Sequence, residues 1–384
     1  MPQILVLLIT TGAINYIYGY FAIGVTLVVF YQRLRRNRIM LNAAYQVDFW
    51  VLFFFGISYA VIGYDGSIQS LFYYVMIPIV SYLAGWVIIE TALQKKETEI
   101  HSIIIAAMLG CCVHAGLNYI SNIGKERWLL TDFFTGELRA ATGSGSMNTI
   151  AFALLFYFLF VEKSRIIKAV GIGCFTVSIL YALLLGTRTQ FIIMVACVLC
   201  GVGLYLFTHK GKKDKIILLM WIAIIGFMAY IAFRFDLGGV RDYIMQSNLN
   251  TRFVNATATA ETDTQRIESI TEGLISLLDN PMGGLNSRTY FHNMWLDVGR
   301  VGGVIPAVLM LLFTMSNLLA VRRFFLSNAQ EEVRYMIALL TCGFILNFFV
   351  EPVLEGLFDS FYFYVILHGM LKCCNNYRVL NTYI

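Results

Sequence analysis

The chain has 384 residues, of which 59% are hydrophobic and 13% charged, and its mean hydropathy is +0.72. Soluble globular domains carry about 25% charged residues, so this composition excludes an ordinary soluble protein and indicates a membrane protein. The net charge of +5 does not call for nucleic acid or another acidic partner, because in a membrane protein the distribution of basic residues over the loops matters more than their sum.

Apolar runs long enough to cross a bilayer recur along the whole chain and leave no separate soluble domain. A spanning helix needs about 20 residues. We therefore predict an all-α fold, a polytopic membrane helical bundle of about eleven transmembrane helices, or about ten to twelve because the first run is long enough for two. Residues 1–384 then form a single integral membrane domain, and the first run is a spanning helix rather than a cleaved signal peptide. The runs lie at 4–31, 47–64, 69–90, 101–123, 147–161, 169–186, 190–208, 216–234, 293–320, 335–350 and 356–371.

Basic clusters occupy alternate loops between these runs. The positive-inside rule assigns such loops to the cytoplasm. With eleven spans, the N-terminus then faces outward and the C-terminus inward. The clusters lie at 33–38, 95–96, 162–168, 209–215, 322–323 and 372–378.

Two long segments fall on the outer side, 124–146 and the larger 235–292, and long loops between packed elements often carry function. Within the larger one, the spacing of apolar residues predicts a helix over 262–279 that lies on the membrane surface. Asn280-Pro281 and Gly283-Gly284 end this helix and turn the chain toward the bilayer. Its apolar side comprises Ile267, Ile270, Leu274 and Leu278.

Arginine dominates the basic residues that are expected outside. The planar guanidinium binds phosphate in a bidentate manner, so an outward arginine cluster indicates a phosphorylated ligand at the membrane. Surface solvation and snorkelling are the alternative. Arg188 in "GTRTQ" is the sharpest case, because so short a turn holds its charge close to hydrocarbon, where it needs an anionic ligand or an acidic side chain. The ten basic residues of the outer side are Arg127, Arg139, Arg188, Arg234, Arg241, Arg252, Arg266, Arg288, Arg300 and Lys125.

The stretch "TYFHNMWLDVGRVGG" (289–303) places polar residues at the start of an apolar run. His292 is the only histidine expected on the outer face, where an imidazole can act as a general base near neutral pH. Asn293, Asp297 and Arg300 follow within about two helical turns, and Asp297 and Arg300 are spaced to interact. A histidine at a helix start can instead serve as a cap or a packing group.

Acidic residues gather at the outer end of the last two runs, in "VEPVLEGLFD". Glu351, Glu355 and Asp359 suit ion pairs with the arginines better than contacts with sugar hydroxyls, although both roles are open. Ionisable residues deep in the spans, which a proton relay requires, are scarce. This scarcity weakens a transporter interpretation.

The sequence shows no nucleotide-binding glycine loop, no DxD-like metal pair in an outer loop and no nucleophile elbow, so we expect neither a metal nor another cofactor. The eight cysteines show no disulfide or zinc-ligand spacing, which indicates packing roles. The candidate site therefore consists of arginines and one histidine, facing outward beside lipid.

Several separated pieces resemble, in order, the O-antigen polymerase and O-antigen ligase superfamily of bacterial envelope glycosyltransferases. "RAATGSGSMN" is similar to an Arg-Gly-Asn stretch, with Arg139 and Asn148 in the matching positions. "GTRTQ" is similar to a short outer turn with Arg188 at its arginine, although a serine often precedes that arginine in the family. Arg266, "NPMGG" and "FHNMWLDVGRVGG" resemble its most specific block. The resemblance covers residues 139–303 and the overall topology.

This resemblance implies a donor glycan linked to polyprenyl pyrophosphate, transferred to an acceptor hydroxyl outside the cytoplasmic (inner) membrane of a bacterium, without a metal and with inversion of the anomeric centre. His292 would deprotonate the acceptor, and Arg188 and Arg266 would bind the pyrophosphate. Further expected partners are membrane lipid and, from the same pathway, a chain-length regulator and a flippase. The substrate-binding residues would be Arg139, Asn148, Arg288, Asn293, Asp297, Arg300, Glu351 and Glu355.

Our leading hypothesis is a polymerase that joins oligosaccharide repeat units into an O-antigen or capsule, favoured by the 30 Phe and 22 Tyr residues, which are typical of that branch. A ligase that passes finished glycan to a lipid or another surface acceptor would use the same chemistry. From other classes, a polysaccharide flippase or transporter would have a charged central cavity and internal duplication. A scaffold subunit would not depend on Arg188 or His292.

Overall fold

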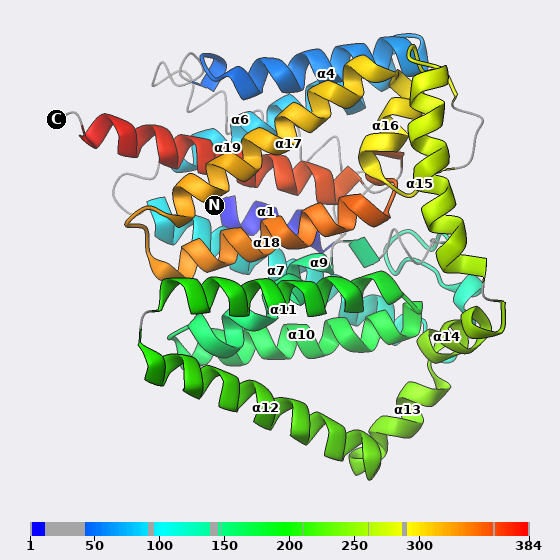
Figure 1. The fold of residues 1–384 in the computed structure, drawn as a ribbon, viewed down its shortest axis with the longest axis vertical. Helices are drawn as coiled ribbons and strands as arrows, with labels where there is room; N and C mark the ends of the chain where they lie inside the picture. Colours follow the sequence, from blue (N-terminus) through cyan, green and yellow to red (C-terminus); the bar gives the residue numbers. More distant parts are fainter. Residues whose placement is uncertain are drawn as a thin grey trace. The chain divides into compact units, whose positions relative to one another are not determined.

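The computed structural model describes residues 2–11, 43–90, 96–138, 145–146, 148–209, 211–259, 261–285, 290–355 and 358–382 (Figure 1). Over these residues the ordered elements are helices, and the one β-type contact is an isolated bridge between Thr131 and Leu138. The all-α prediction is therefore confirmed for this part of the chain.

Eight helices of the described part are long and apolar enough to cross a membrane, which supports a multi-pass membrane protein. The predicted run 47–64 coincides with α4, and 69–90 coincides with a continuous helical segment that contains a π-helical stretch, η1. The total of eleven spans stays a prediction, because most of the first run falls outside the described residues. The predicted runs 147–161 and 356–371 lie mainly within the described residues but are not among the eight helices. The eight are α4 (Val47–Tyr64), the segment Ile68–Glu90, α7 (Lys96–Ser121), α10 (Arg165–Leu185), α11 (Arg188–Thr208), α12 (Lys212–Arg234), α17 (Val304–Phe325) and α18 (Glu331–Val350).

Shorter or more polar elements complete the chain. Segment Ile68–Glu90 is built from α5 (Ile68–Leu71), η1 (Phe72–Met76) and α6 (Ile77–Glu90). The others are α1 (Pro2–Thr10), η2 (Arg127–Leu129), α9 (Thr149–Ala153), η3 (Tyr157–Val161), η4 (Leu237–Gly239), α13 (Val240–Gln246), α14 (Asn248–Thr259), α15 (Glu261–Asp279), α16 (Met294–Gly302), η5 (Val353–Glu355) and α19 (Phe358–Thr382).

Two predicted runs are not continuous helices. Run 147–161 is divided into α9 and η3, because Leu154 leaves helical geometry with φ −87° and ψ 0°. Run 293–320 breaks at Gly303, where φ is +81°, into α16 and α17. The spanning helix therefore begins at Val304, and the polar residues 293–300 lie on a separate short helix.

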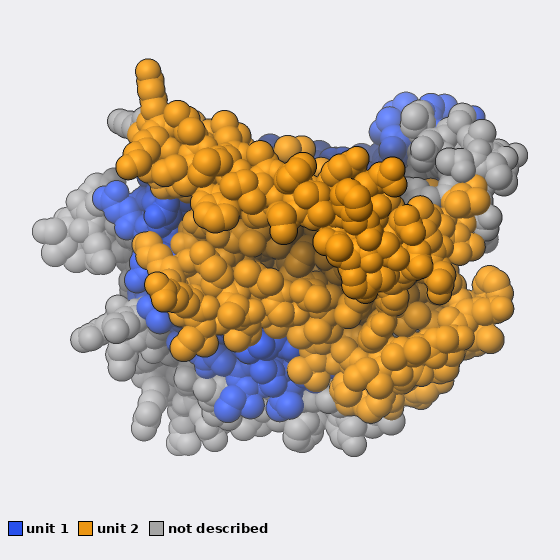
Figure 2. All heavy atoms as spheres, turned by 90° about the horizontal axis from the view of Figure 1, so that it is seen from below, with its two compact units in different colours: residues 1–110, 263–384 blue, residues 111–262 orange. Residues whose placement is uncertain are grey.

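The chain divides into two compact units, residues 1–110 with 263–384 and residues 111–262, which we call unit 1 and unit 2 (Figure 2). Helix α7 contributes to both. The prediction of one integral membrane domain stays a prediction, and we describe each unit by itself.

In unit 1, α6 packs along α19 at very short range, and glycine makes the approach possible. A Cβ on Gly85 would overlap the carbonyl oxygen of Ile366, and one on Gly369 would overlap that of Tyr82. Small residues permit such backbone contacts between helices in lipid, where helix association depends on close packing. Helices α16 and α17 pack against α4 in the same unit.

In unit 2, α10 packs against α9 and η3, and α11 packs against α9. A Cβ on Gly171 or Gly201 would overlap the rings of Phe158 and Phe156, respectively, so these glycines set the helix spacing. The helix predicted over 262–279 is observed as α15, most of which belongs to unit 1. Its side chains Ile270, Leu274 and Leu278 are exposed rather than packed on protein.

Candidate functional site

A polar turn precedes α16 in unit 1 and contains the predicted general base. Asn293 has extended backbone geometry, and its Oδ1 accepts the N–H of Leu296 at 3.2 Å, which makes it the N-cap of α16. His292, immediately before it, has φ +53° and an exposed side chain. A non-glycine residue in this left-handed region is strained by about 1–3 kcal/mol and persists only where its surroundings hold it.

Asp297 supplies that hold. Its Oδ1 accepts the N–H of Phe291 at 2.8 Å and its Oδ2 accepts the N–H of Asn293 at 3.2 Å, so one carboxylate binds the backbone on both sides of His292. Burial raises the pKa of Asp297 above its ordinary value, although the two N–H groups and Arg300 act in the opposite direction. On the other side, α15 approaches through Gly273, where a Cβ would lie 3.0 Å from Leu296 Cδ1 and 3.2 Å from the ring of Phe291.

Arg300 is buried and joins two acidic residues. Its Nε lies 3.4 Å from Asp297 Oδ1, its Nη1 donates to the carbonyl oxygen of Leu285 at 2.7 Å, and its Nη2 pairs with Glu355. The ion pair expected between an arginine and the acidic cluster is thus observed for Glu355. A further contact of Arg300, Glu355 or Asp297 with sugar or phosphate stays a prediction, and the burial of the Arg300 side chain argues against it.

The "NPMGG" turn is bound to the end of α16 by backbone contacts. The N–H of Gly284 donates to Val301 O at 2.9 Å, and the N–H of Val304 donates to Pro281 O at 2.8 Å. A Cβ on Gly283 would overlap the backbone nitrogen of Gly303. The glycines in this block therefore allow two backbone segments to touch beneath the polar turn.

In unit 2, three arginines converge on the turn between α10 and α11. Gly186 ends α10 in the left-handed conformation at φ +66°. Arg252 Nη1 donates to Gly186 O at 2.8 Å, and Arg127 Nε donates to Leu185 O at 3.2 Å. Arg188 is the first residue of α11. We call Arg127, Arg188 and Arg252 the arginine group.

The arginine group concentrates positive charge at one helix terminus. Burial and the neighbouring charge of Arg188 both lower the pKa of Arg127. Cations at the last carbonyls of α10 complement the dipole of this helix. This structural role accounts for one donor of Arg127 and one donor of Arg252. A guanidinium has five N–H donors, and the backbone N–H groups at the start of α11 also favour an anion.

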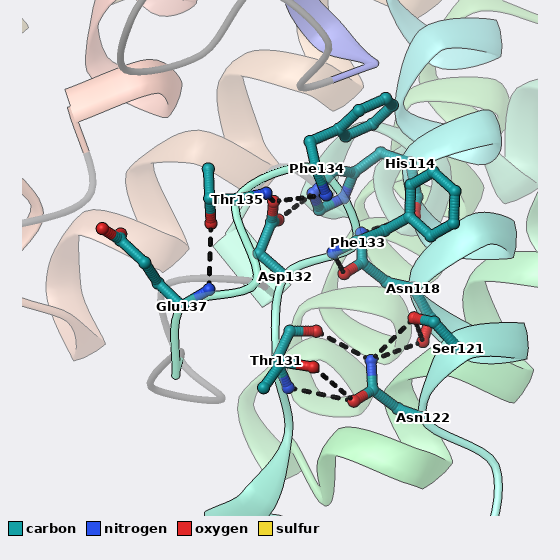
Figure 3. Close-up of polar contacts among 10 residues, drawn as sticks. All are labelled: His114, Asn118, Ser121, Asn122, Thr131, Asp132, Phe133, Phe134, Thr135 and Glu137. Atoms are coloured by element: carbon teal, nitrogen blue, oxygen red, sulfur yellow. Dashed lines mark hydrogen bonds and ion pairs between the residues drawn. The ribbon is translucent and has the colours of Figure 1, made fainter.

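Arg127 belongs to η2, and the segment that follows it, residues 131–137, is hydrogen-bonded to the end of α7 and to Asn122 (Figure 3). Asn122 Oδ1 accepts the N–H of Thr131 at 2.9 Å, and Asn118 Oδ1 accepts the N–H of Phe133 at 3.0 Å. Asp132 Oδ1 accepts the N–H groups of Phe134 and Thr135, each at 3.0 Å, while its Oδ2 lies 3.3 Å from Nε2 of His114. These contacts order the segment that follows Arg127.

His114 is therefore a second histidine beside a predicted outer loop, although its sequence position indicated only a span. It contacts Asp132 and is buried, with 9% of its surface exposed, whereas the side chain of His292 is exposed. Exposure favours His292 as the base for an external substrate.

Asn148 lies near the arginine group in unit 2. It precedes α9, which packs against α11, and the next residue, Thr149, donates its hydroxyl to Gln190 Oε1 at 3.3 Å. Asn148 Nδ2 and Thr187 Oγ1 are both buried without a hydrogen-bond partner among the described residues. The structure thus brings Asn148 and Arg188, 40 positions apart in sequence, to the same end of unit 2.

Other predicted site residues are less informative. Glu351 is buried, with 3% exposed. Arg139 and Arg288 lie outside the described residues, and Arg266 falls on α15 with a side chain that is likewise outside them. The sequence identifies Arg127 and Arg252 only as arginines expected on the outer side, because no sequence spacing relates them to Arg188.

Within the described ranges, no group of three His, Cys, Asp or Glu side chains lies close enough to hold a metal ion. No protein-family model and no curated protein matches the chain. The resemblance to envelope glycosyltransferases therefore stays a hypothesis from the sequence, and its support must come from the chemistry of the site residues.

Proposed function

We propose that this protein is a membrane glycosyltransferase that polymerises oligosaccharide repeat units, carried on polyprenyl pyrophosphate, into a surface polysaccharide at the outer face of the bacterial cytoplasmic membrane. The observation that carries the proposal is the convergence of Arg127, Arg188 and Arg252 on one turn. Three guanidinium groups around the turn between two helices suit a pyrophosphate, whose several oxygens can accept bidentate hydrogen bonds.

In the proposed reaction the arginine group stabilises the negative charge that develops on the pyrophosphate as the bond from the anomeric carbon to its oxygen breaks. A preorganised donor of this kind typically contributes about 10² to 10³ in rate. Arg266 is proposed as a further pyrophosphate ligand, on the resemblance alone.

His292 is proposed to accept the proton of the acceptor hydroxyl while the hydroxyl oxygen attacks the anomeric carbon from the side opposite the leaving pyrophosphate. The new glycosidic bond then has inverted configuration. Proton transfer by a positioned imidazole typically contributes about 10² to 10⁴ in rate. The exposed side chain of His292 and the fixed backbone on both sides of it support this role.

The test is gel profiling of surface and lipid-linked glycan in cells that lack the protein, complemented with wild type, Arg188→Ala, Arg252→Gln or His292→Ala. We expect each variant to stop surface glycan at a single repeat unit, as in the null strain. Immunoblots of the membrane fraction establish that the variants accumulate normally.

Two matched controls accompany these variants. Arg241→Ala removes a half-exposed arginine that pairs with Asp242, and His209→Gln changes a histidine that stacks on Tyr205. Both are expected to leave long glycan in place. Full-length glycan that accumulates on the lipid carrier in the null strain would indicate the ligase instead. Wild-type glycan in both Arg188→Ala and His292→Ala would contradict the catalytic roles proposed for these two residues.

A further inference from the structure

A stripe of buried polar side chains runs along α19 in unit 1. Ser360, Tyr364, His368 and Lys372 recur every four residues and therefore share one face of the helix. Ser360 and His368 are fully buried, and Tyr364 is 2% exposed. At about 1.5 Å per residue the stripe extends roughly 18 Å, more than half of a bilayer core about 30 Å thick.

A charged group lies at the inner end of this stripe. Asp48 Oδ2 of α4 is 2.5 Å from Lys372 Nζ and 3.4 Å from His368 Nε2. On the other side of the ring, Asn317 Nδ2 of α17 donates to His368 Nδ1 at 2.9 Å. Tyr82 of α6 is the other titratable side chain against His368, with its ring 5.9 Å away.

Several buried polar atoms of α19 and of the two helices that pack against it, α17 and α18, have no partner among the described residues. They are Tyr364 Oη, Asn317 Oδ1 and both polar atoms of the Asn347 side chain, all buried. The Tyr364 ring packs edge-on against Phe344 and Phe348, which flank Asn347 on α18. A buried polar atom without a partner costs about 1–3 kcal/mol, and proteins usually satisfy such atoms with internal water.

We propose that this stripe, hydrated at Asn347 and Tyr364, is a proton pathway through unit 1. Ionisable residues inside a membrane are expensive and mark proton relays where they face one another. A proton reaches His368 from the Asp48–Lys372 end, where Lys372 is partly exposed, and moves along water beside Tyr364 and Asn347 toward the other end of α19.

Asn317 suits a histidine that changes protonation state. Its Nδ2 donates to the unprotonated Nδ1 of neutral His368. When that nitrogen binds a proton, a half-turn of the amide presents Oδ1, which has no partner in the structure, as the acceptor. Asp48 Oδ2 faces the other ring nitrogen in both states and balances the imidazolium charge.

The alternative is a static polar cluster that only joins helices through interhelical hydrogen bonds. Tyr364→Phe and Asn347→Leu separate the two possibilities, because both remove groups that make no hydrogen bond in the structure. A static cluster predicts that these two variants behave like wild type. A hydrated pathway predicts that they slow proton movement while thermal unfolding stays unchanged.

The experiment reconstitutes the full chain into phospholipid vesicles that enclose a pH-sensitive dye. Potassium-loaded vesicles with valinomycin impose an inside-negative potential, and acidification of the lumen is recorded. We expect wild type to acidify vesicles several-fold faster than protein-free vesicles, and Asp48→Asn, His368→Gln, Tyr364→Phe and Asn347→Leu to approach the protein-free rate. His209→Gln, which changes a histidine stacked on Tyr205 in unit 2, is expected to keep the wild-type rate.

Either of two results overturns the pathway: wild-type flux equal to that of protein-free vesicles, or wild-type flux in both Tyr364→Phe and Asn347→Leu. Because these two variants break no observed hydrogen bond, the test stands even if Asp48→Asn or His368→Gln does not fold. The pathway does not depend on the proposed glycosyl transfer, which is measured by glycan length rather than by acidification.

Discussion

At the residue scale, the best-defined feature is the single carboxylate of Asp297, which binds two backbone N–H groups and a buried guanidinium. The residue between those two N–H groups is His292, which has strained backbone geometry. Asp297 therefore fixes the backbone position from which the His292 side chain extends. This is a positioning role, distinct from the proton transfer proposed for His292.

We predict that Asp297→Asn lowers the free energy of unfolding by about 3–5 kcal/mol. The substitution removes one of the two negative charges that pair with buried Arg300, and the new amide NH₂ group faces one of the two backbone N–H groups that the carboxylate accepts. Thermal unfolding of the purified protein in detergent measures the change. The control, Asp242→Asn, removes an exposed partner of Arg241 and should cost less than about 1 kcal/mol. Equal shifts in the two variants would contradict the role assigned to Asp297.

At the element scale, the break between α16 and α17 determines which residues lie on the membrane-spanning helix. Gly303 is held at positive φ because the turn 281–284 packs directly against it. The polar residues of α16 are thereby separated from the apolar α17.

Gly283 and Gly284 provide a matched pair to test this contact. Both have positive φ, 75° and 82°, but a Cβ on Gly283 would overlap Gly303, whereas one on Gly284 meets nothing within 4 Å. We predict that Gly284→Ala costs about 1–2 kcal/mol from backbone strain alone and that Gly283→Ala costs clearly more. Thermal unfolding compares the two, and equal losses would show that strain rather than close packing explains both glycines.

At the scale of the whole molecule, the eight long apolar helices support a multi-pass membrane protein, and the basic clusters predict its orientation. We predict that alkaline phosphatase fused after Lys213 is inactive, because the basic cluster 209–215 is predicted to face the cytoplasm. The same enzyme fused after Asp236, beyond the other end of α12, should be active. Reversed activities would invert the topology and place the arginine group on the wrong face for an external substrate.

A glycan profile that does not depend on Arg188 or His292, together with proton flux through the α19 stripe, would instead favour the transporter class.

The sequence by itself determined the membrane class, the helical fold and the limits of several spans, such as 47–64 and 69–90. These are local properties: hydropathy over a window of about 20 residues is enough to predict a spanning helix. It also identified His292, Asn293 and Asp297 as neighbours, because about one helical turn separates them.

Only the tertiary structure decided which distant residues meet. Arg127 and Arg252 join the turn before Arg188 from segments far away in the chain, and Asp48 reaches His368 and Lys372 across more than 300 positions. The break at Gly303 likewise depends on a contact with the turn at 281–284. Such pairings depend on how helices pack, and helix packing is set by side-chain shape and close backbone contacts that no local periodicity encodes.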